Sequence, residues 1–405
     1  MSQIRLLNNN FSKNIPELMK SIGVDPYGIK IMSSKSLHRV IYVQEVSSFV
    51  ANILKQELLS LGADAAIPKQ ALFKKTLVNL IIFATDSQLI RLLQKLQKQP
   101  TSLKKFSQEL KLALKNFSQS NFKLRVKDKI ISVNKPLIMG ILNVTKDSFS
   151  GDGILDEIKD KFSSEKYLIT KIRLMLKDGA SIIDIGAEST RPGSKSISCK
   201  EEINRLSPVL KVIKKEFPKN TFSIDTYKPE VAKFALDRGV AIVNDITALE
   251  SDSMAKLISK YKAGVILMHK KGTPFNMQKN PKYDDVIGEI YNFLKERVNK
   301  ALDFGVKKDS IIIDPGIGFG KRTEDNLEII KYLYQFKTIG LPILLGVSRK
   351  TFIGKITGID LPKDRINGTL IANMFGVLNG ANIIRVHDLD QNLMAIKLTQ
   401  RIISL

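Results

Sequence analysis

The most constraining feature of this sequence is a regular alternation of short apolar runs with segments of helical spacing. The apolar runs recur at residues 137–142, 181–186, 221–224, 240–243, 264–268, 311–313, 342–346 and 382–386. Between them lie amphipathic segments such as 201–217, 229–239 and 324–336. Runs that are apolar throughout suit parallel strands buried on both faces. Eight such strands alternating with helices predict a (β/α)₈ TIM barrel, with a doubly wound open sheet as the alternative.

A second, smaller domain is expected before the barrel, because 405 residues exceed the usual size of one domain. Two strand-like runs, 39–46 and 77–85, and three amphipathic segments predict a small α/β or α+β fold. This part contains no phosphate loop, metal-ligand cluster or nucleophile arrangement. We therefore expect an accessory domain of unknown role at residues 1–133. A basic connector, 118–133, would join it to a catalytic domain at 134–405.

Composition narrows the classes of partner. The net charge is +24, and the first 135 residues hold 22 Lys+Arg against 8 Asp+Glu. Of these 22 cations 18 are scattered Lys, whereas Arg is the better residue for recognising phosphates and bases, so we expect solvated helix faces and no nucleic-acid partner. No apolar run reaches the roughly 18 residues of a membrane span, and the N-terminus lacks the pattern of a secretory signal. The single cysteine, Cys199, fits a reducing compartment, which predicts a cytoplasmic protein without a membrane partner.

Polar side chains follow every predicted strand, at the end where a barrel enzyme forms its active site. In chain order the residues noted at these strand ends, polar except for Pro192, Met268 and Phe319, are Asn143, Thr145 and Asp147; Asp184, Glu188, Thr190, Arg191 and Pro192; Asp225; Asn244 and Asp245; Met268 and His269; Asp314, Phe319 and Lys321; Ser348, Arg349 and Lys350; Arg385 and His387. A single polar loop after a core strand is an ordinary surface feature. Eight in succession indicate an active site.

Seven motifs from these loops, in the same order, resemble the dihydropteroate synthases: GILNVTKDSFS, IDIGAESTRPG, VNDI, MHKKGTP, DPGIGFGK, SRKTFIG and RVHD. The resemblance runs from about residue 136 to the C-terminus, and the first third resembles an extension found on some longer bacterial members. It implies a TIM barrel that condenses 6-hydroxymethyl-7,8-dihydropterin pyrophosphate with p-aminobenzoate, giving 7,8-dihydropteroate and pyrophosphate for folate synthesis. It further implies Mg²⁺ as cofactor, a homodimer, and a target of sulfonamides, which mimic p-aminobenzoate.

The resemblance also implies a role for each site residue. A dihydropterin edge presents N–H donors beside a carbonyl, which suits buried carboxylates and an amide. The implied pterin contacts are Asp225, Asn244, Met268, Asp314 and Lys350. The implied p-aminobenzoate contacts are Thr190, Pro192, Phe319, Ser348 and Lys350. Pyrophosphate would contact Asn143, Thr190, Arg191, Arg385 and His387, with Asn143 also contacting Mg²⁺. The catalytic set would be Asp225, Lys350, Arg191, Arg385 and His387.

Two loops depart from the family pattern, and two other functions stay open. Lys146 stands where Pro is usual, and residues 151–153 vary the turn that follows. A pterin-binding methyltransferase on the same barrel, which passes a methyl group from a methyl-folate to a corrinoid protein, is the nearest alternative. It should lack the pyrophosphate contacts and the SRK loop. A basic nucleic-acid-binding or scaffold protein with an inactive barrel is the alternative from a different class.

Overall fold

The computed structural model describes residues 4, 15–145, 161–188, 196–273 and 276–404. Its internal contacts divide the chain into two compact units, Met1–Leu114 and Lys115–Leu405. The second unit therefore begins before the domain border predicted at 133/134, because it includes a hairpin that packs on the barrel. Within the described ranges, no helix is both long enough and apolar enough to cross a membrane.

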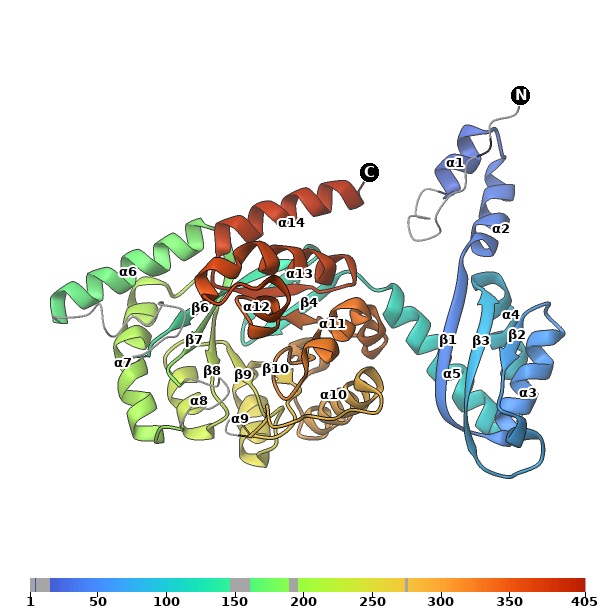
Figure 1. Ribbon diagram of the computed structural model, residues 1–405, viewed down its shortest axis with the longest axis horizontal. Coiled ribbons are helices and arrows are strands. Elements are labelled where there is room, and N and C mark those ends of the chain that lie inside the picture. The colour runs from blue at the N-terminus through green and yellow to red at the C-terminus, as the bar shows by residue number, and fades with distance from the viewer. Residues whose placement is uncertain (1–3, 5–14, 146–160, 189–195, 274–275, 405) are drawn as a thin grey trace. The chain divides into compact units, whose positions relative to one another are not determined.

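The first unit is built on a three-stranded antiparallel sheet in the order β1-β3-β2 (Figure 1). Its strands are β1 (His38–Ser47), β2 (Asp64–Ala66) and β3 (Leu77–Thr85). Its helices are α1 (Ile15–Ser21), α2 (Pro26–Ser36), α3 (Ser48–Leu59), the short η2 (Lys69–Leu72), α4 (Asp86–Leu96) and α5 (Thr101–Ser118), which continues into the second unit.

Alternation along β3 explains how this unit packs. Val78, Leu80, Ile82 and Ala84 are buried, while the residues between them face outward. The buried side chains share one core with the leucines of α3 and α4 and with the first half of α5. Side-chain caps fix where the two helices begin. Ser47 accepts a hydrogen bond from Val50 N at the start of α3, and Thr85 forms a capping box with Gln88 at the start of α4.

The second unit contains an eight-stranded sheet of parallel strands in the order β11-β10-β9-β8-β7-β6-β13-β12. A parallel bridge between Ile313 and Ile343 joins its two ends, which confirms the predicted closed barrel. The strands are β6 (Leu137–Asn143), β7 (Ala180–Gly186), β8 (Phe222–Asp225), β9 (Ile242–Asp245), β10 (Gly264–Met268), β11 (Ile311–Asp314), β12 (Leu344–Leu345) and β13 (Ile383–Val386).

Helices surround this barrel (Figure 1). They are α6 (Lys161–Lys177), α7 (Cys199–Glu216), α8 (Pro229–Leu236), α9 (Asp252–Tyr261), α10 (Val286–Asp303), α11 (Thr323–Lys331), α12 (Thr351–Thr357), α13 (Ile366–Leu378) and α14 (Leu389–Ile403). The described part of this unit also contains the 3₁₀ turns η4 (Lys308–Ser310), η5 (Leu333–Ile339) and η6 (Pro362–Arg365). The largest apolar core lies between the strands and these helices.

A hairpin closes the end of the barrel where the strands begin. Residues 118–133, predicted as a connector, contain β4 (Phe122–Val126) and β5 (Lys129–Val133), paired antiparallel. Leu124, Val126 and Val133 are buried in one cluster with side chains from seven of the eight barrel strands. At the turn, Lys127 N donates to Lys262 O over 2.7 Å. This end is therefore filled with apolar side chains, and the polar ends of the strands lie at the other.

Candidate active site

The strand register brings the first polar residues of the predicted site into one row. Asn143 pairs with Gly186, Gly186 with Asp225, and Asp225 with Asn244 across four neighbouring strands. Asn143 and Asp225 flank Gly186 closely, because a Cβ on Gly186 would be in ordinary van der Waals contact, at 3.8 Å, with both Asn143 Oδ1 and Asp225 Oδ2. These residues therefore meet at the carboxyl ends of the strands, as a barrel active site requires.

A buried network of charges occupies the centre of this row. Arg385, on β13, donates from Nε to Asp184 Oδ2 over 2.7 Å and from Nη2 to Asp225 Oδ2 over 2.9 Å. Asn244 Nδ2 donates to the same oxygen of Asp184 over 3.0 Å. Both carboxylates are buried, so pairing with the guanidinium offsets the cost of removing them from water. The guanidinium has more N–H donors than these two bonds use.

Three oxygens of this network accept no hydrogen bond within the described part of the chain. They are Asp184 Oδ1, Asp225 Oδ1 and Asn244 Oδ1, all buried. Burial raises the pKa of Asp225 to about 7, although Arg385 opposes the shift, and the charge of Asp184 adds to it. A buried acceptor without a donor costs free energy. The arrangement thus suits a ligand that presents several N–H donors along one edge.

The opposite wall comes from the loops after β11 and β12. Lys350 Nζ donates to Ile317 O and lies 4.7 Å above the centre of the Phe319 ring. Burial lowers the pKa of Lys350 to about 8, and the nearby charge of Asp314 opposes this. Burial also raises the pKa of Asp314, whose Oδ1 accepts a 2.7 Å hydrogen bond from Gly316 N. A cation and an aromatic face thus stand beside a carboxylate, a combination that suits a flat heterocycle.

Ser348 and His387 lie together at the ends of β12 and β13. Ser348 Oγ is 2.9 Å from His387 Nδ1, and it accepts a hydrogen bond from His387 N over 3.3 Å. Beside them Arg349 pairs with Asp388, with an Nη2–Oδ1 distance of 2.5 Å. Arg349 has φ +58°, a left-handed conformation that favours glycine, so its backbone is strained where the loop enters the site. The Arg349 guanidinium thus pairs with Asp388, whereas the next residue, Lys350, lies over the Phe319 ring.

His269 and Lys321 form a buried pair that sequence reasoning left without a role. Lys321 Nζ lies 2.9 Å from His269 Nδ1, and burial lowers the pKa of both side chains. Their loops meet backbone to backbone, since a Cβ on Gly316, at φ +70°, would lie 1.8 Å from His269 O. The contact locks the loop after β10 to the loop after β11. His269 and Lys321 therefore hold in place the loop that carries Asp314 and Phe319.

The structure brings together most of the site residues named from the sequence. They are Asn143, Asp225, Asn244, Met268, Asp314, Phe319, Ser348, Lys350, Arg385 and His387. Asp147, Thr190, Arg191 and Pro192 lie outside the described residues. Asp184 was named at the end of its predicted strand but without a role, although it bonds both Arg385 and Asn244. A carboxylate within an otherwise apolar run of a parallel strand is the signal that points to such a role.

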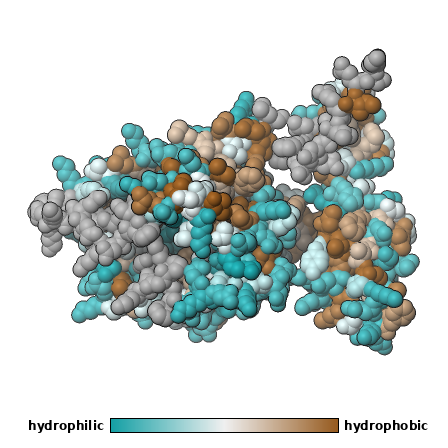
Figure 2. Space-filling model, in the orientation of Figure 1, coloured by the Kyte–Doolittle hydropathy of each residue, from teal (hydrophilic) through white to brown (hydrophobic). Residues whose placement is uncertain are grey.

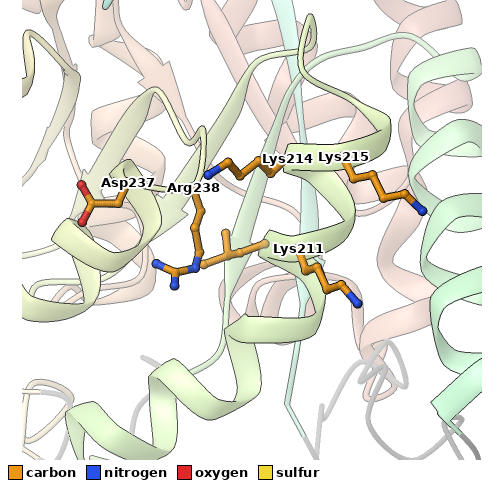
Figure 3. Close-up of a pocket in the computed structure, with 6 residues that line it drawn as sticks. Lys211, Lys214, Lys215, Asp237 and Arg238 are labelled. Carbon is orange, nitrogen blue, oxygen red and sulfur yellow. The ribbon is translucent and has the colours of Figure 1, made fainter.

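Two other features of the described chain bear on ligands. No group of three or more His, Cys, Asp or Glu side chains that could hold a metal ion occurs in the described ranges. A pocket in the helical layer between α7 and α8 is lined by Leu210, Lys211, Lys214, Lys215, Asp237 and Arg238 (Figure 3). These residues come from the ends of the helices that precede β8 and β9. The pocket therefore lies near the starts of the strands, away from the row of polar strand ends.

Comparisons with known proteins agree with this geometry. The family model described as pterin binding enzyme matches residues 139–387. A bifunctional dihydropteroate synthase/dihydropteroate reductase of Helicobacter pylori is 36% identical over 97% of this chain and 97% of its own. A dihydropteroate synthase of Clostridium beijerinckii is 43% identical over 66% of this chain and 94% of its own. The crystal structure of Yersinia pestis dihydropteroate synthase with a sulfonamide drug complex superposes with a TM-score of 0.65.

That Yersinia pestis structure is 33% identical in sequence and covers 70% of this chain and 100% of its own. The residues that the family model matches, 139–387, include the polar row at the ends of the strands. The matches are long, specific and in agreement about one enzyme class. The chain belongs to the pterin-binding enzymes and, among them, to the dihydropteroate synthases.

Proposed function

We propose that this enzyme condenses 6-hydroxymethyl-7,8-dihydropterin pyrophosphate with p-aminobenzoate, giving 7,8-dihydropteroate and pyrophosphate. The observation that carries the proposal is the set of three buried acceptors on Asp184, Asp225 and Asn244, facing the Lys350–Phe319 wall. A pterin combines a flat ring with a row of N–H donors on one edge and an acceptor on another, which matches this arrangement. Family membership supports the same reaction.

In this proposal the pterin lies between the two walls. Asp225 and Asn244 would accept its N–H groups, Asp314 those of the neighbouring edge, and Lys350 would donate to its carbonyl side. Met268, buried at the end of β10, would contact the ring. With a pKa of about 7, Asp225 is partly protonated near neutral pH. A pterin that donates N–H groups to its carboxylate would stabilise the ionised form.

Pyrophosphate leaves when the C–O bond at the methylene carbon breaks and the bonding electrons go to the leaving oxygen. Arg385 and His387, with Arg191 from the sequence pattern, would stabilise that charge. The donors present fit a Mg²⁺ ion held mainly by substrate, because Asn143 supplies one amide oxygen beside Asp225 at the strand ends. When bound, the ion would neutralise charge on the phosphates.

The amine of p-aminobenzoate then forms the new C–N bond and releases a proton. An aniline nitrogen is unprotonated at neutral pH, so positioning contributes more than a strong base. Thr190, Pro192, Phe319, Ser348 and Lys350 are the proposed contacts. Within the described ranges Ser348 and Lys350 are fixed by His387 and by Ile317, respectively, which supports their use as positioning groups.

Pyrophosphate release by the purified enzyme, with dihydropterin pyrophosphate and Mg²⁺, tests this proposal. We expect release to depend on p-aminobenzoate and to fall at least about 100-fold in Lys350→Ala, which removes a charged hydrogen bond and ring packing worth roughly 3 kcal/mol together. Folded enzyme without turnover would reject the proposal. Methyl transfer from a methyl-folate to a corrinoid protein would favour the alternative.

We also propose a second activity, reduction of 7,8-dihydropteroate. The match to the Helicobacter pylori bifunctional protein covers 97% of both chains and therefore includes the first unit, whereas the Clostridium beijerinckii synthase covers 66% of this chain. A hydride would pass from a reduced flavin or nicotinamide to C6, and a proton to N5, giving tetrahydropteroate and the oxidised donor. Incubation with dihydropteroate and each donor, followed by mass spectrometry, tests it. No tetrahydropteroate with any donor would reject it.

Apolar stripes on the last two helices support the proposal of a homodimer. Ile371, Phe375 and Leu378 on α13 and Met394 and Leu398 on α14 are each more than half exposed, and the two helices pack side by side. Hydrophobic surface is visible where these helices lie (Figure 2). Such a stripe fits its own copy across a twofold axis. Phe375→Lys should convert a dimer to a monomer in light scattering; an unchanged mass would place the interface elsewhere.

We propose the cytoplasm as the location of this enzyme, where free Cys199 stays reduced.

A further inference from the structure

The loop after β11 carries Phe319 on a backbone that needs support. Gly316, Gly318 and Gly320 have φ values of +70°, +80° and +65°, so every second residue of the loop is left-handed. Glycine loses more backbone freedom on folding than any other residue. A loop built in this way keeps one conformation only where other groups hold its peptides.

Side chains donate a hydrogen bond to each of four consecutive carbonyls in this loop. The pairs are Lys350 Nζ to Ile317 O, Gln278 Nε2 to Gly318 O over 2.6 Å, Lys321 Nζ to Phe319 O over 3.2 Å, and Tyr283 Oη to Gly320 O over 2.8 Å. The second and fourth donors both belong to the segment between β10 and α10. Their acceptors come directly before and after Phe319. That segment therefore holds the backbone on both sides of the Phe319 ring.

Tyr283 is itself well placed to hold the loop. Its ring packs against the apolar core of the barrel, and Lys271 Nζ lies 4.1 Å from the ring centre. Burial raises the pKa of Tyr283, and the charge of Asp325 adds to the shift, so the hydroxyl keeps its proton and donates at neutral pH. The two backbones meet here, because a Cβ on Gly320 would lie 2.2 Å from Lys271 O.

The direction of the Phe319 ring depends on these bonds. Phe319 is only partly buried, and Lys350 Nζ lies 4.7 Å from its ring centre. Backbone angles decide which rotamers a side chain can adopt. A shift of the peptides before and after Phe319 would therefore turn its ring relative to Lys350.

The pterin wall is held by other contacts. Its three buried acceptors, on β7, β8 and β9, have their hydrogen bonds in the described chain with Arg385 or with one another. Asp314 Oδ1 accepts from Gly316 N, at the opposite end of the loop from Tyr283. Removing the Tyr283 hydroxyl changes no charge, so the electrostatic surroundings of these carboxylates stay as they are. A change at Tyr283 should therefore separate the two substrates.

We propose that Tyr283 and Gln278 are positioning residues for p-aminobenzoate, because they hold the peptides on either side of Phe319 and so fix the ring that would contact this substrate. The inference rests on the proposed function, which assigns Phe319 to p-aminobenzoate. Tyr283 and Gln278 act on the reaction through Phe319. Tyr283 contributes more, since its bond is partly buried and that of Gln278 is exposed to water.

The test combines Tyr283→Phe, which removes only a hydroxyl, with Phe319→Leu in a double-mutant cycle. Tyr261→Phe is the matched control, because the Tyr261 hydroxyl also donates a hydrogen bond, to Asp237 Oδ1 over 2.6 Å, at the end of α9. For each protein we would measure KM and kcat against p-aminobenzoate at saturating dihydropterin pyrophosphate. The affinity for 6-hydroxymethylpterin, followed by its fluorescence, reports the pterin wall.

In Tyr283→Phe we expect KM for p-aminobenzoate to rise at least about fivefold, as the loss of one partly buried hydrogen bond implies, with pterin affinity within about twofold of wild type. In the Phe319→Leu background the same change should alter KM less than about twofold, because the ring through which Tyr283 acts is gone. Tyr261→Phe should resemble wild type.

Three results would overturn the proposal. They are an unchanged KM in Tyr283→Phe, an equal rise in KM with and without the Phe319 ring, and a loss of pterin affinity as large as the rise in KM. The second and third would assign Tyr283 a general structural role. Wild-type enzyme without turnover would instead reject the proposed function on which the inference rests.

A second variant tests the other donor. Gln278→Met keeps the length of the side chain and removes its N–H groups. We expect KM for p-aminobenzoate to rise at least about twofold in Gln278→Met, and at least about tenfold when it is combined with Tyr283→Phe. A combined variant no weaker than Tyr283→Phe alone would overturn the part of the proposal that concerns Gln278.

Discussion

Replacing Asp225 by Asn separates binding from stability in one residue. The change keeps the size of the side chain, removes its charge and replaces an acceptor by a donor. In the structure Asp225 Oδ2 is bonded to Arg385, and Oδ1 is a buried acceptor that would receive a pterin N–H group. The side-chain amide introduced by Asp225→Asn has one acceptor oxygen and one N–H₂ group, so its N–H₂ would face a donor, either Arg385 or the pterin N–H. We therefore expect a large loss of pterin binding without loss of the fold.

The loss of binding follows from the hydrogen bonds involved. A hydrogen bond to a charged group is worth about 1.5–3 kcal/mol, and a mismatched buried donor adds a cost of similar size. Together these give roughly 3–4 kcal/mol, or a decrease in kcat/KM of at least about 100-fold. The decrease should appear in pterin affinity as well as in turnover, because Asp225 contacts the substrate before the reaction begins.

The same substitution, Asp225→Asn, should raise the stability of the folded enzyme at neutral pH although it weakens pterin binding. Because burial raises the pKa of Asp225 from 3.8 to about 7, the folded state binds the proton more tightly than the unfolded state. Stability from this group is therefore fully present below about pH 4 and is lost as pH rises to about 7, by at most about 4 kcal/mol. The uncharged Asn avoids this loss. The Tm of Asp225→Asn minus the Tm of wild type should therefore be larger at pH 8 than at pH 5.

Calorimetry at pH 5 and pH 8, together with steady-state kinetics, makes the comparison. Asp309→Asn is the control, since Asp309 forms an exposed ion pair with Arg125 far from the polar strand ends. An Asp225→Asn enzyme with kcat/KM within fivefold of wild type would refute the role in pterin binding. A Tm difference that is smaller at pH 8 than at pH 5 would refute the electrostatic argument.

Three further substitutions test other parts of the account. Lys350→Met should lower kcat/KM at least about 100-fold in steady-state assays while Tm falls by only a few degrees, because its removal relieves a buried charge; intact activity would reject its role. Gly316→Ala should unfold at lower urea by at least about 2 kcal/mol, since its Cβ would lie 1.8 Å from His269 O; an unchanged midpoint would contradict the close approach. Val126→Asp places a charge in the apolar cluster under the barrel and should cost about 3 kcal/mol or more in the same urea assay; a variant as stable as wild type would show that the hairpin does not seal the barrel.

Most of the barrel could be predicted from the sequence because parallel strands buried on both faces leave an unmistakable pattern of short apolar runs. The second strand was predicted at 181–186 and is β7 at Ala180–Gly186. The seventh was predicted at 342–346, but its ladder, β12, has two residues, Leu344 and Leu345. Pairing at the closing strand depends on tertiary contacts that no local pattern records. Its polar end, Ser348–Lys350, was still recognised.

The hairpin at 122–133 was missed for a different physical reason. Its strands, FKLRV and KIISV, have only five residues each, and the first carries the cations Lys123 and Arg125 at its exposed positions. Only alternate residues are buried, and their partner surface is the open end of a barrel formed later in the chain. Asp184 was named among the strand-end residues but given no role, because an inward side chain in a strand buried on both faces has no periodic signature. Its partner Arg385 lies 201 residues away.

One measurement tests the central claim most directly: analysis of the products formed from dihydropterin pyrophosphate and p-aminobenzoate labelled with ¹⁵N at the amine. We predict 7,8-dihydropteroate that retains the ¹⁵N label, formed in equal amount with pyrophosphate and at least about 100-fold more slowly in Asp225→Asn. That result would show that the row of polar strand ends joins the amine to the methylene carbon. Pyrophosphate formed without labelled dihydropteroate would mean hydrolysis alone, and it would contradict the account.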